Sequence, residues 1–240
     1  MSYSIYFILG ILPSIIWLLF FLRQDADPEP NRVIIKVFFL GIIAALLAAV
    51  FECFFFEVSG EVNITKDIKN IINIFIGVAF IEEYFKYLVV RRCAIRDKDF
   101  DEPTDVMLYM VIAGLGFAAL ENTLVFLIPS SQPINIPSVL SLALFRFIGA
   151  TFLHALTSGL IGFSLAISFL RKKHKFKIVA AGIAVSVFLH GLYNFSIMEL
   201  AASLKITVPA IILLSLAITV LIAFEKLRNT ASICRVKAKK

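Results

Sequence analysis

Long apolar stretches separated by short polar gaps constrain this chain more than any other feature. A bilayer core of ~30 Å needs ~20 apolar residues in a helix, and seven stretches reach about that length. Hydrophobic residues make up 60% of the chain, whereas soluble domains contain about 45–50%. The sequence therefore predicts an all-α, polytopic membrane helix bundle of about seven transmembrane helices. The predicted spans are residues 3–22, 33–56, 71–90, 106–128, 144–170, 178–198 and 206–224.

The polar gaps are too short to fold on their own, so we expect one integral membrane domain over residues 1–240. The first stretch lacks a basic leader region and a small-residue cleavage site, which favours a retained helix over a signal peptide. The region 138–170 is too long for one straight span, and it contains Arg146. A short interfacial helix that enters a span, giving eight helices, is therefore the alternative to seven.

Basic residues alternate sharply between the gaps. Clusters of Lys and Arg fall in the gaps at 23–36, 91–98 and 171–177 and after residue 225, while the intervening gaps hold few or none. The positive-inside rule then puts the N-terminus outside and the C-terminus in the cytoplasm. The formal net charge of +6 is explained by these loops and by anionic lipid, so no nucleic-acid partner is expected. We expect a multi-pass protein of a bacterial cytoplasmic membrane.

Three ionisable residues lie close together inside the third apolar stretch. Lys86 follows Glu82 at i+4 and Glu83 at i+3, so it can meet both carboxylates on a helix. At ~1.5 Å per residue, Glu82 lies near the middle of the bilayer. A charge at that depth costs at least ~2.5–3.5 kcal/mol and usually faces a cavity where it acts. The pair suits general acid and base roles, with Lys86 holding one carboxylate ionised; a structural Glu–Lys bridge is the plainer alternative.

The fourth stretch carries Glu121 and Asn122 about a third of the way in from the predicted outer face. They follow a run of small residues that allows a neighbouring helix to approach closely. Glu121 can be another catalytic acid, a metal ligand, or a partner that orients an imidazole. A polar pair that only helps the helices to pack is the other interpretation.

Two histidines lie inside the fifth and sixth stretches. His154 and His190 are both deep enough to lie in the bilayer, and Asn194 follows His190 at i+4 on the same helical face. Asn194 can orient the imidazole or donate a hydrogen bond to a developing oxyanion. A single intramembrane histidine is often only a packing residue, but two of them beside several carboxylates form a set that can activate water.

The sequence contains no HExxH or GxSxG motif, and no Ser–Lys pair stands out. A set of histidines and glutamates without a nucleophile points to hydrolysis by activated water, without an acyl-enzyme. Two histidines and carboxylates can also hold zinc. The candidate metal ligands are Glu82, Glu121, His154 and His190, and the same groups would equally serve a glutamate base that needs no metal.

These motifs resemble those of the PrsW family, the intramembrane proteases that cleave membrane-bound anti-sigma factors. That family is related to the type II CAAX prenyl proteases and to the CPBP/Abi membrane proteins. Asn194 matches the His-x-x-x-Asn pattern of the CAAX branch, whereas Ala150 stands where that branch has Phe. The resemblance runs through most of the chain, in Asp27-Pro28-Glu29-Pro30, Glu82-Glu83-x-x-Lys86, Phe100-Asp101-Glu102, Gly116 to Asn122, Arg146, His154-Ala155-Leu156 and His190-Gly191-Leu192-Tyr193.

The resemblance implies a helix bundle with a central hydrophilic cavity and a first cut near the outer face of a single-span membrane protein. It also implies that Glu82, Glu83, His154 and His190 are active-site residues, joined by Glu121. Lys86 would tune the glutamate pair and Asn194 would assist. The alternatives are a protease for prenylated peptides, an inactive immunity or scaffold protein, and a proton-coupled transporter, since carboxylates and histidines also form proton relays.

Overall fold

The computed structural model describes residues 3–25, 28–95, 100, 102–127, 136–171 and 173–238. Every regular element within these ranges is helical, which confirms the predicted all-α bundle. Asp27 and Asp101, which belong to two of the motifs above, lie outside the described residues. In chain order, with η for π-helical segments, the elements are α1 (Tyr3–Leu22), α2 (Asn31–Glu61), α3 (Lys66–Ile72), η1 (Asn73–Phe80), α4 (Ile81–Val89), η2 (Val90–Ala94), α5 (Pro103–Leu127), α6 (Ile136–Phe145), η3 (Arg146–Ala150), α7 (Thr151–Leu170), α8 (Lys175–Glu199) and α9 (Leu204–Ala238).

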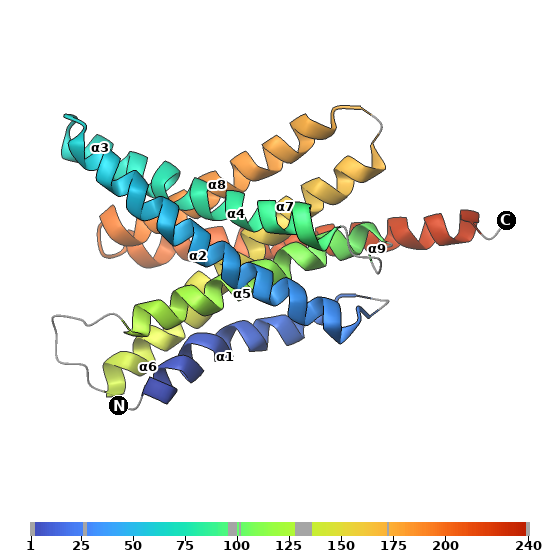
Figure 1. The fold of residues 1–240 in the computed structure, drawn as a ribbon, viewed down its shortest axis with the longest axis horizontal. Helices are drawn as coiled ribbons and strands as arrows, with labels where there is room; N and C mark the ends of the chain where they lie inside the picture. Colours follow the sequence, from blue (N-terminus) through green and yellow to red (C-terminus); the bar gives the residue numbers. More distant parts are fainter. Residues whose placement is uncertain are drawn as a thin grey trace.

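Within the described residues, six helical runs are long and apolar enough to cross a membrane: α1, α2, α5, the continuous α6–η3–α7 run, α8 and α9. They correspond to six of the predicted spans, so the chain is a multi-pass membrane protein. The remaining prediction, 71–90, falls on a run in which α-helical and π-helical segments alternate from Lys66 to Ala94. Figure 1 shows this run crossing the bundle beside α2.

The sequence left open whether residues 138–170 form one helix or two, and the structure shows a helix whose type changes along its length. Helix α6 ends at Phe145, η3 begins at Arg146, and α7 follows at Thr151 without an intervening loop. The short helix expected before the fifth span is therefore α6, and it is joined to α7 by a π-helical turn.

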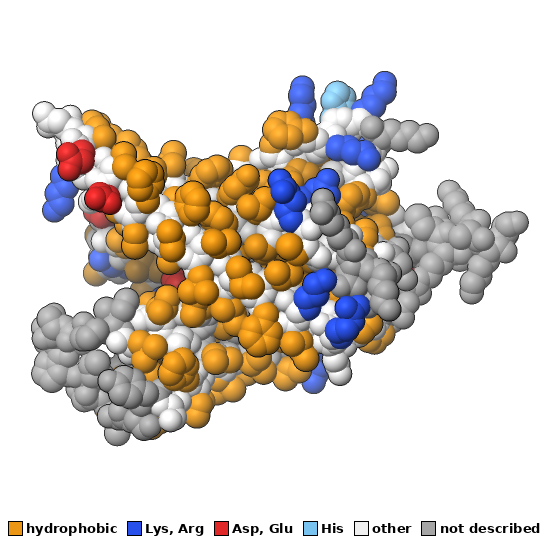
Figure 2. All heavy atoms as spheres, in the orientation of Figure 1, with side chains coloured by type: hydrophobic (Ala, Val, Ile, Leu, Met, Phe, Trp, Pro, Cys, Tyr) orange, Lys and Arg blue, Asp and Glu red, His pale blue; other side chains and the backbone are white. Residues whose placement is uncertain are grey.

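The molecular surface has an apolar middle and two polar ends (Figure 2). One end, here called the basic end, holds the end of α1, the end of η2 and the start of α8, with the exposed residues Arg23, Arg91 and Lys175. The opposite end, here called the acidic end, holds α3 and the end of α2, with the exposed residues Asp67 and Glu57. Between them, large hydrophobic side chains are widely exposed, as expected for a surface that faces lipid. This separation agrees with the alternation of basic loops, and the assignment of the acidic end to the outside remains a prediction.

Helix α5 lies at the centre of the bundle, packed against α1, α2 and α7 and buried along most of its length. Its contact with α2 is close because both helices present glycine there. A Cβ added to Gly116 would lie 2.0 Å from the carbonyl oxygen of Phe38, and one added to Gly41 would lie 2.1 Å from that of Ala113. Without side chains at these positions the two backbones touch, which is how small residues support packing in membranes.

Replacing Gly116 with Ala should separate α2 from α5, because the added methyl group would overlap a backbone carbonyl that cannot rotate away. We expect a loss of about 1–3 kcal/mol, the usual cost of overpacking, seen as a lower midpoint of thermal unfolding in detergent. Gly60→Ala is the matched control, since nothing lies within 4 Å of a Cβ at Gly60. Equal stability of the two variants would contradict this description of the α2–α5 contact.

Candidate active site

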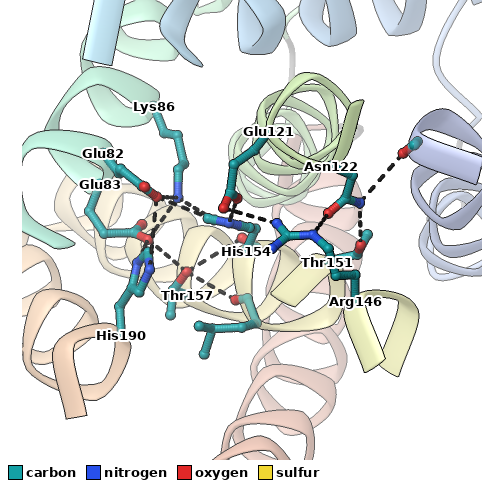
Figure 3. A network of polar contacts seen from close by, with 12 residues as sticks. Glu82, Glu83, Lys86, Glu121, Asn122, Arg146, Thr151, His154, Thr157 and His190 are labelled. Atoms are coloured by element: carbon teal, nitrogen blue, oxygen red, sulfur yellow. Dashed lines mark hydrogen bonds and ion pairs between the residues drawn. The ribbon is translucent and has the colours of Figure 1, made fainter. Parts of the chain in front are cut away.

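The sequence-predicted residues come together from four helices. Helix α4 supplies Glu82, Glu83 and Lys86, while α5, α7 and α8 supply Glu121, His154 and His190 (Figure 3). All but Glu121 are buried, and Glu121 is partly buried. The structure thus places in one cluster six of the seven residues singled out from the sequence, and the seventh, Asn194, lies nearby in a cavity wall.

Lys86 is the centre of this cluster and has no solvent-accessible surface. Its Nζ donates to Oε1 of Glu83 at 2.8 Å and to Nδ1 of His154 at 2.7 Å. It lies farther from Glu82, with 3.7 Å between Nζ and Oε2. The ammonium also lies 4.5 Å from the ring centroid of Phe117, a favourable cation–π distance. Lys86 therefore pairs with Glu83 much more closely than with Glu82.

Glu83 is held on one oxygen by three donors. Besides Lys86, Oε1 accepts hydrogen bonds from the Thr157 hydroxyl at 2.9 Å and from Nδ1 of His190 at 2.8 Å. The bond to His190 requires the proton on Nδ1, which leaves Nε2 of that ring as an acceptor. Glu83 therefore fixes both the orientation and the tautomer of His190. Carboxylates that accept a hydrogen bond from a metal-binding histidine commonly have this role.

His154 has the opposite tautomer. Its Nε2 donates to Oε2 of Glu121 at 2.7 Å, and its Nδ1 accepts from Lys86. The two imidazole rings lie 5.2 Å apart between centroids and are nearly perpendicular. Their acceptor nitrogens, Nδ1 of His154 and Nε2 of His190, both face Oε2 of Glu82, at 3.7 Å and 3.8 Å.

Oε2 of Glu82 is buried and lacks a hydrogen-bond partner within the described part of the chain. Together with the acceptor nitrogens of His154 and His190 it forms a set of three ligand atoms within 4.8 Å of one another. The distances of 3.7 Å and 3.8 Å from Oε2 of Glu82 to the two imidazole nitrogens can each be bridged by an ion ~2.0–2.2 Å from its ligands. One carboxylate with two imidazoles is also a common catalytic zinc set. The residues present therefore fit a metal ion. Because Nδ1 of His154 also accepts from Lys86, a metal there requires Lys86 to release that bond.

Glu121 is the fourth metal ligand proposed from sequence, but its two oxygens have other partners. Oε2 binds His154, and Oε1 lies 2.9 Å from the guanidinium of Arg146, the first residue of η3. Arg146 also donates to Oδ1 of Asn122, whose amide donates to the Thr151 hydroxyl at 2.8 Å. This arrangement favours a supporting role for Glu121, which orients His154.

A cavity of about 820 Å³ leads to the cluster. Glu82, His154 and His190 line its inner part, and Asn194 adds an amide to the wall. The rest of the lining is largely apolar and comes from α6, η3, α8 and α9, including residues as near the acidic end as Met198. We call it the active-site cavity.

Two further residues belong to the site although sequence reasoning missed them. Thr157 lies one turn after His154 and donates a hydrogen bond to Glu83. Glu52 of α2 is partly buried, and its charge interacts with those of Glu121 and Lys86. Glu52 could have been found by the rule that identified Glu82, since it is a carboxylate inside the second apolar stretch. Thr157 had no comparable signal, because threonine is common in transmembrane helices.

Residues 29–223 match the profile of the PrsW family intramembrane metalloproteases. The chain is 28% identical to Protease PrsW of Oceanobacillus iheyensis over 205 residues, covering 85% of this chain and 88% of that protein. It is 27% identical to Protease PrsW of Bacillus subtilis over 207 residues, with 85% and 88% covered. Protease PrsW of Geobacillus kaustophilus is 27% identical over 190 residues, with 78% and 76% covered. No solved structure matches the chain.

Removal of Glu83 alone should be strongly destabilising, because it leaves the buried Lys86 charge without its closest counterion. Breaking a buried ion pair from one side costs about 3–5 kcal/mol. Glu83→Ala and Lys86→Ala should each lower the thermal unfolding midpoint, and the double variant should lose much less than the sum of the two. Additive losses in this double-mutant cycle would mean that the two side chains are not energetically coupled.

Proposed function

The chain belongs to the PrsW family of intramembrane metalloproteases, and we propose that it hydrolyses a peptide bond of a single-span membrane protein near the outer face of the membrane. The substrate class, a membrane-anchored protein of the anti-sigma-factor type, comes from the family resemblance. The observation that carries the proposed mechanism is the partnerless carboxylate oxygen of Glu82, which faces two imidazole acceptor nitrogens at the inner part of a peptide-sized cavity.

Glu82 is the glutamate best placed to act on water. Glu83 accepts three hydrogen bonds on one oxygen, so its charge is already stabilised by Lys86, Thr157 and His190. Glu82 has no comparable donor within the described residues and lines the active-site cavity. Without a metal, Glu82 takes the proton of the attacking water and passes it to the leaving amine, as general bases do. With a metal bound, Oε2 of Glu82 would be a ligand of that ion instead.

The metal of this site would be held by Glu82, His154 and His190. When bound, a divalent ion such as zinc polarises the scissile carbonyl and makes its bound water a stronger acid. With the metal bound, Glu83 would still orient His190, and Glu121 would still orient His154. A mechanism without a metal remains the alternative because Lys86 already donates to the ligand nitrogen of His154. In that case Glu82 alone would activate the water and Lys86 would supply the positive charge.

The shape of the active-site cavity supports the expected place of the cut. It extends from His190 to Met198, eight residues or ~12 Å along α8 toward the acidic end. A membrane-spanning segment that unwinds from that end can bring its backbone to the cluster without crossing the bundle. Asn194 lies on this path and can donate its amide to the oxyanion that forms in the transition state.

Glu82→Gln should abolish cleavage, because the amide is nearly the same size but cannot accept the proton. We expect a fall in rate of about 10²–10⁴-fold, the usual contribution of a general base, for a single-span anti-sigma-type reporter cleaved in detergent. Glu57→Gln removes an exposed carboxylate of α2 and is the control. If Glu82→Gln cleaves at the rate of Glu57→Gln, Glu82 has no part in the chemistry.

Bound metal should be measured on the same samples. About one equivalent of a divalent ion is expected in the unchanged protein, and His190→Ala should lower both metal content and cleavage. Cleavage that persists after chelation, in protein without measurable metal, would refute the metal mechanism and favour Glu82 acting alone.

Ala210→Trp should block the active-site cavity without touching the cluster. Ala210 lines the cavity on α9, and its neighbour Ile211 is exposed and lies outside it. The expected result is a loss of cleavage of at least about tenfold for Ala210→Trp, with normal metal content and thermal stability, while Ile211→Trp behaves as the unchanged protein. Equal activity of the two tryptophan variants would argue against peptide binding in this cavity.

A further inference from the structure

A second cavity of about 790 Å³ lies on the basic-end half of the bundle, away from the active-site cavity. One wall comes from the η1–α4–η2 run and the other from α8, with Ser168 and Phe169 of α7 between them. Figure 1 shows α8 diverging from α4 toward the end that carries the α7–α8 loop. We call this cavity the basic-end groove. Its walls include Phe75, Tyr87 and Arg91 on one side and Lys175, Ala184 and Phe188 on the other.

The length of the groove matches one leaflet of a membrane. Along α8 it runs from Lys175 to Phe188, which is ~20 Å at ~1.5 Å per residue. A bilayer measures ~40–45 Å including its headgroup regions, so a single leaflet is ~20 Å deep. The groove therefore begins at headgroup level and ends near the membrane midplane.

The lining of the groove changes from charged to apolar along this length, as a phospholipid changes from its headgroup to its acyl chains. Arg91 and Lys175 are exposed and stand at the headgroup end. The deeper walls are apolar and rich in aromatic rings, with Phe75 and Phe188 packed 6.2 Å apart at the inner end. None of the described residues that line the groove is acidic. Two cations above an apolar slot are complementary to an anionic headgroup above acyl chains.

We propose that the basic-end groove binds one anionic phospholipid of the leaflet at the basic end. The headgroup phosphate lies between Arg91 and Lys175, and an acyl chain follows the aromatic wall to Phe188. The volume lies within the ~300–1,000 Å³ of typical small-molecule sites.

The site has a physical connection to the active centre. The ring of Phe75 at the inner end of the groove lies against Gly191, where an added Cβ would be 2.4 Å from its Cδ1. Gly191 directly follows His190 on α8. A lipid in the groove therefore stabilises the contact between η1 and the part of α8 that carries His190.

The test is lipid retention by the full chain, measured by native mass spectrometry after extraction from vesicles of equal phosphatidylglycerol and phosphatidylcholine. One phosphatidylglycerol molecule should stay bound to the unchanged protein. Arg91→Gln/Lys175→Gln should reduce that adduct at least about tenfold. Arg92→Gln/Lys177→Gln removes the same charge from exposed positions outside the groove and should retain it. Equal retention by the two double variants, or equal retention of the two lipids, would overturn the proposal.

A photoreactive phenylalanine analogue identifies what occupies the groove. Placed at Ala184, which lines it, the analogue should give adducts with the mass of phosphatidylglycerol in excess of the vesicle composition. At Val185, which is exposed outside the groove, the adducts should follow that composition. A polypeptide adduct at 184, or the same lipid ratio at both positions, would refute the lipid site. Neither readout depends on protease activity, so both tests stand whether or not the proposed cleavage is observed.

Discussion

The buried pair of Lys86 and Glu83 is the interaction on which the arrangement of the site depends. In an apolar bundle, one unpaired charge costs several kcal/mol, so the ammonium must be surrounded by acceptors. Those acceptors come from different helices: Glu83 belongs to α4 and is shared with His190 of α8, and His154 belongs to α7. Satisfying one charge therefore fixes two imidazoles and leaves Glu82 as the carboxylate without a committed partner.

Two π-helical segments precede the candidate site residues and set the helix faces on which they lie. Segment η1 ends at Phe80, two residues before Glu82, and η3 ends at Ala150, four residues before His154. A π turn accommodates an extra residue and so rotates the following side chains relative to an α-helical repeat, which explains why such turns often occur at functional sites. Segment η3 also begins with Arg146, whose guanidinium binds Glu121.

Sequence reasoning predicted most of the fold and the residues of the candidate site because the membrane penalises polar groups so heavily. Apolar length alone located the spans, and intramembrane ionisable residues located the cluster. Helix periodicity cannot reveal a π turn, so the π-helical segments between Lys66 and Ala94 were missed. Nor can spacing distinguish Glu82 from Glu83, because the difference arises from donors on α7 and α8, Thr157 and His190. Such distinctions become visible only when the helices are assembled.

Among the described residues, the active-site cavity that reaches the cluster extends toward the acidic end. On the opposite side Lys86 is fully buried and the next turn places Val89 and Val90 in the core. A proton-coupled transporter must expose its central site alternately to both faces, which this packing opposes. A hydrolase has the reverse requirement: water and peptide must arrive from one side, and a closed opposite side prevents the buried carboxylates from conducting protons across the membrane. The burial of Lys86 therefore serves both needs, as it organises the reactive groups and seals the bundle behind them.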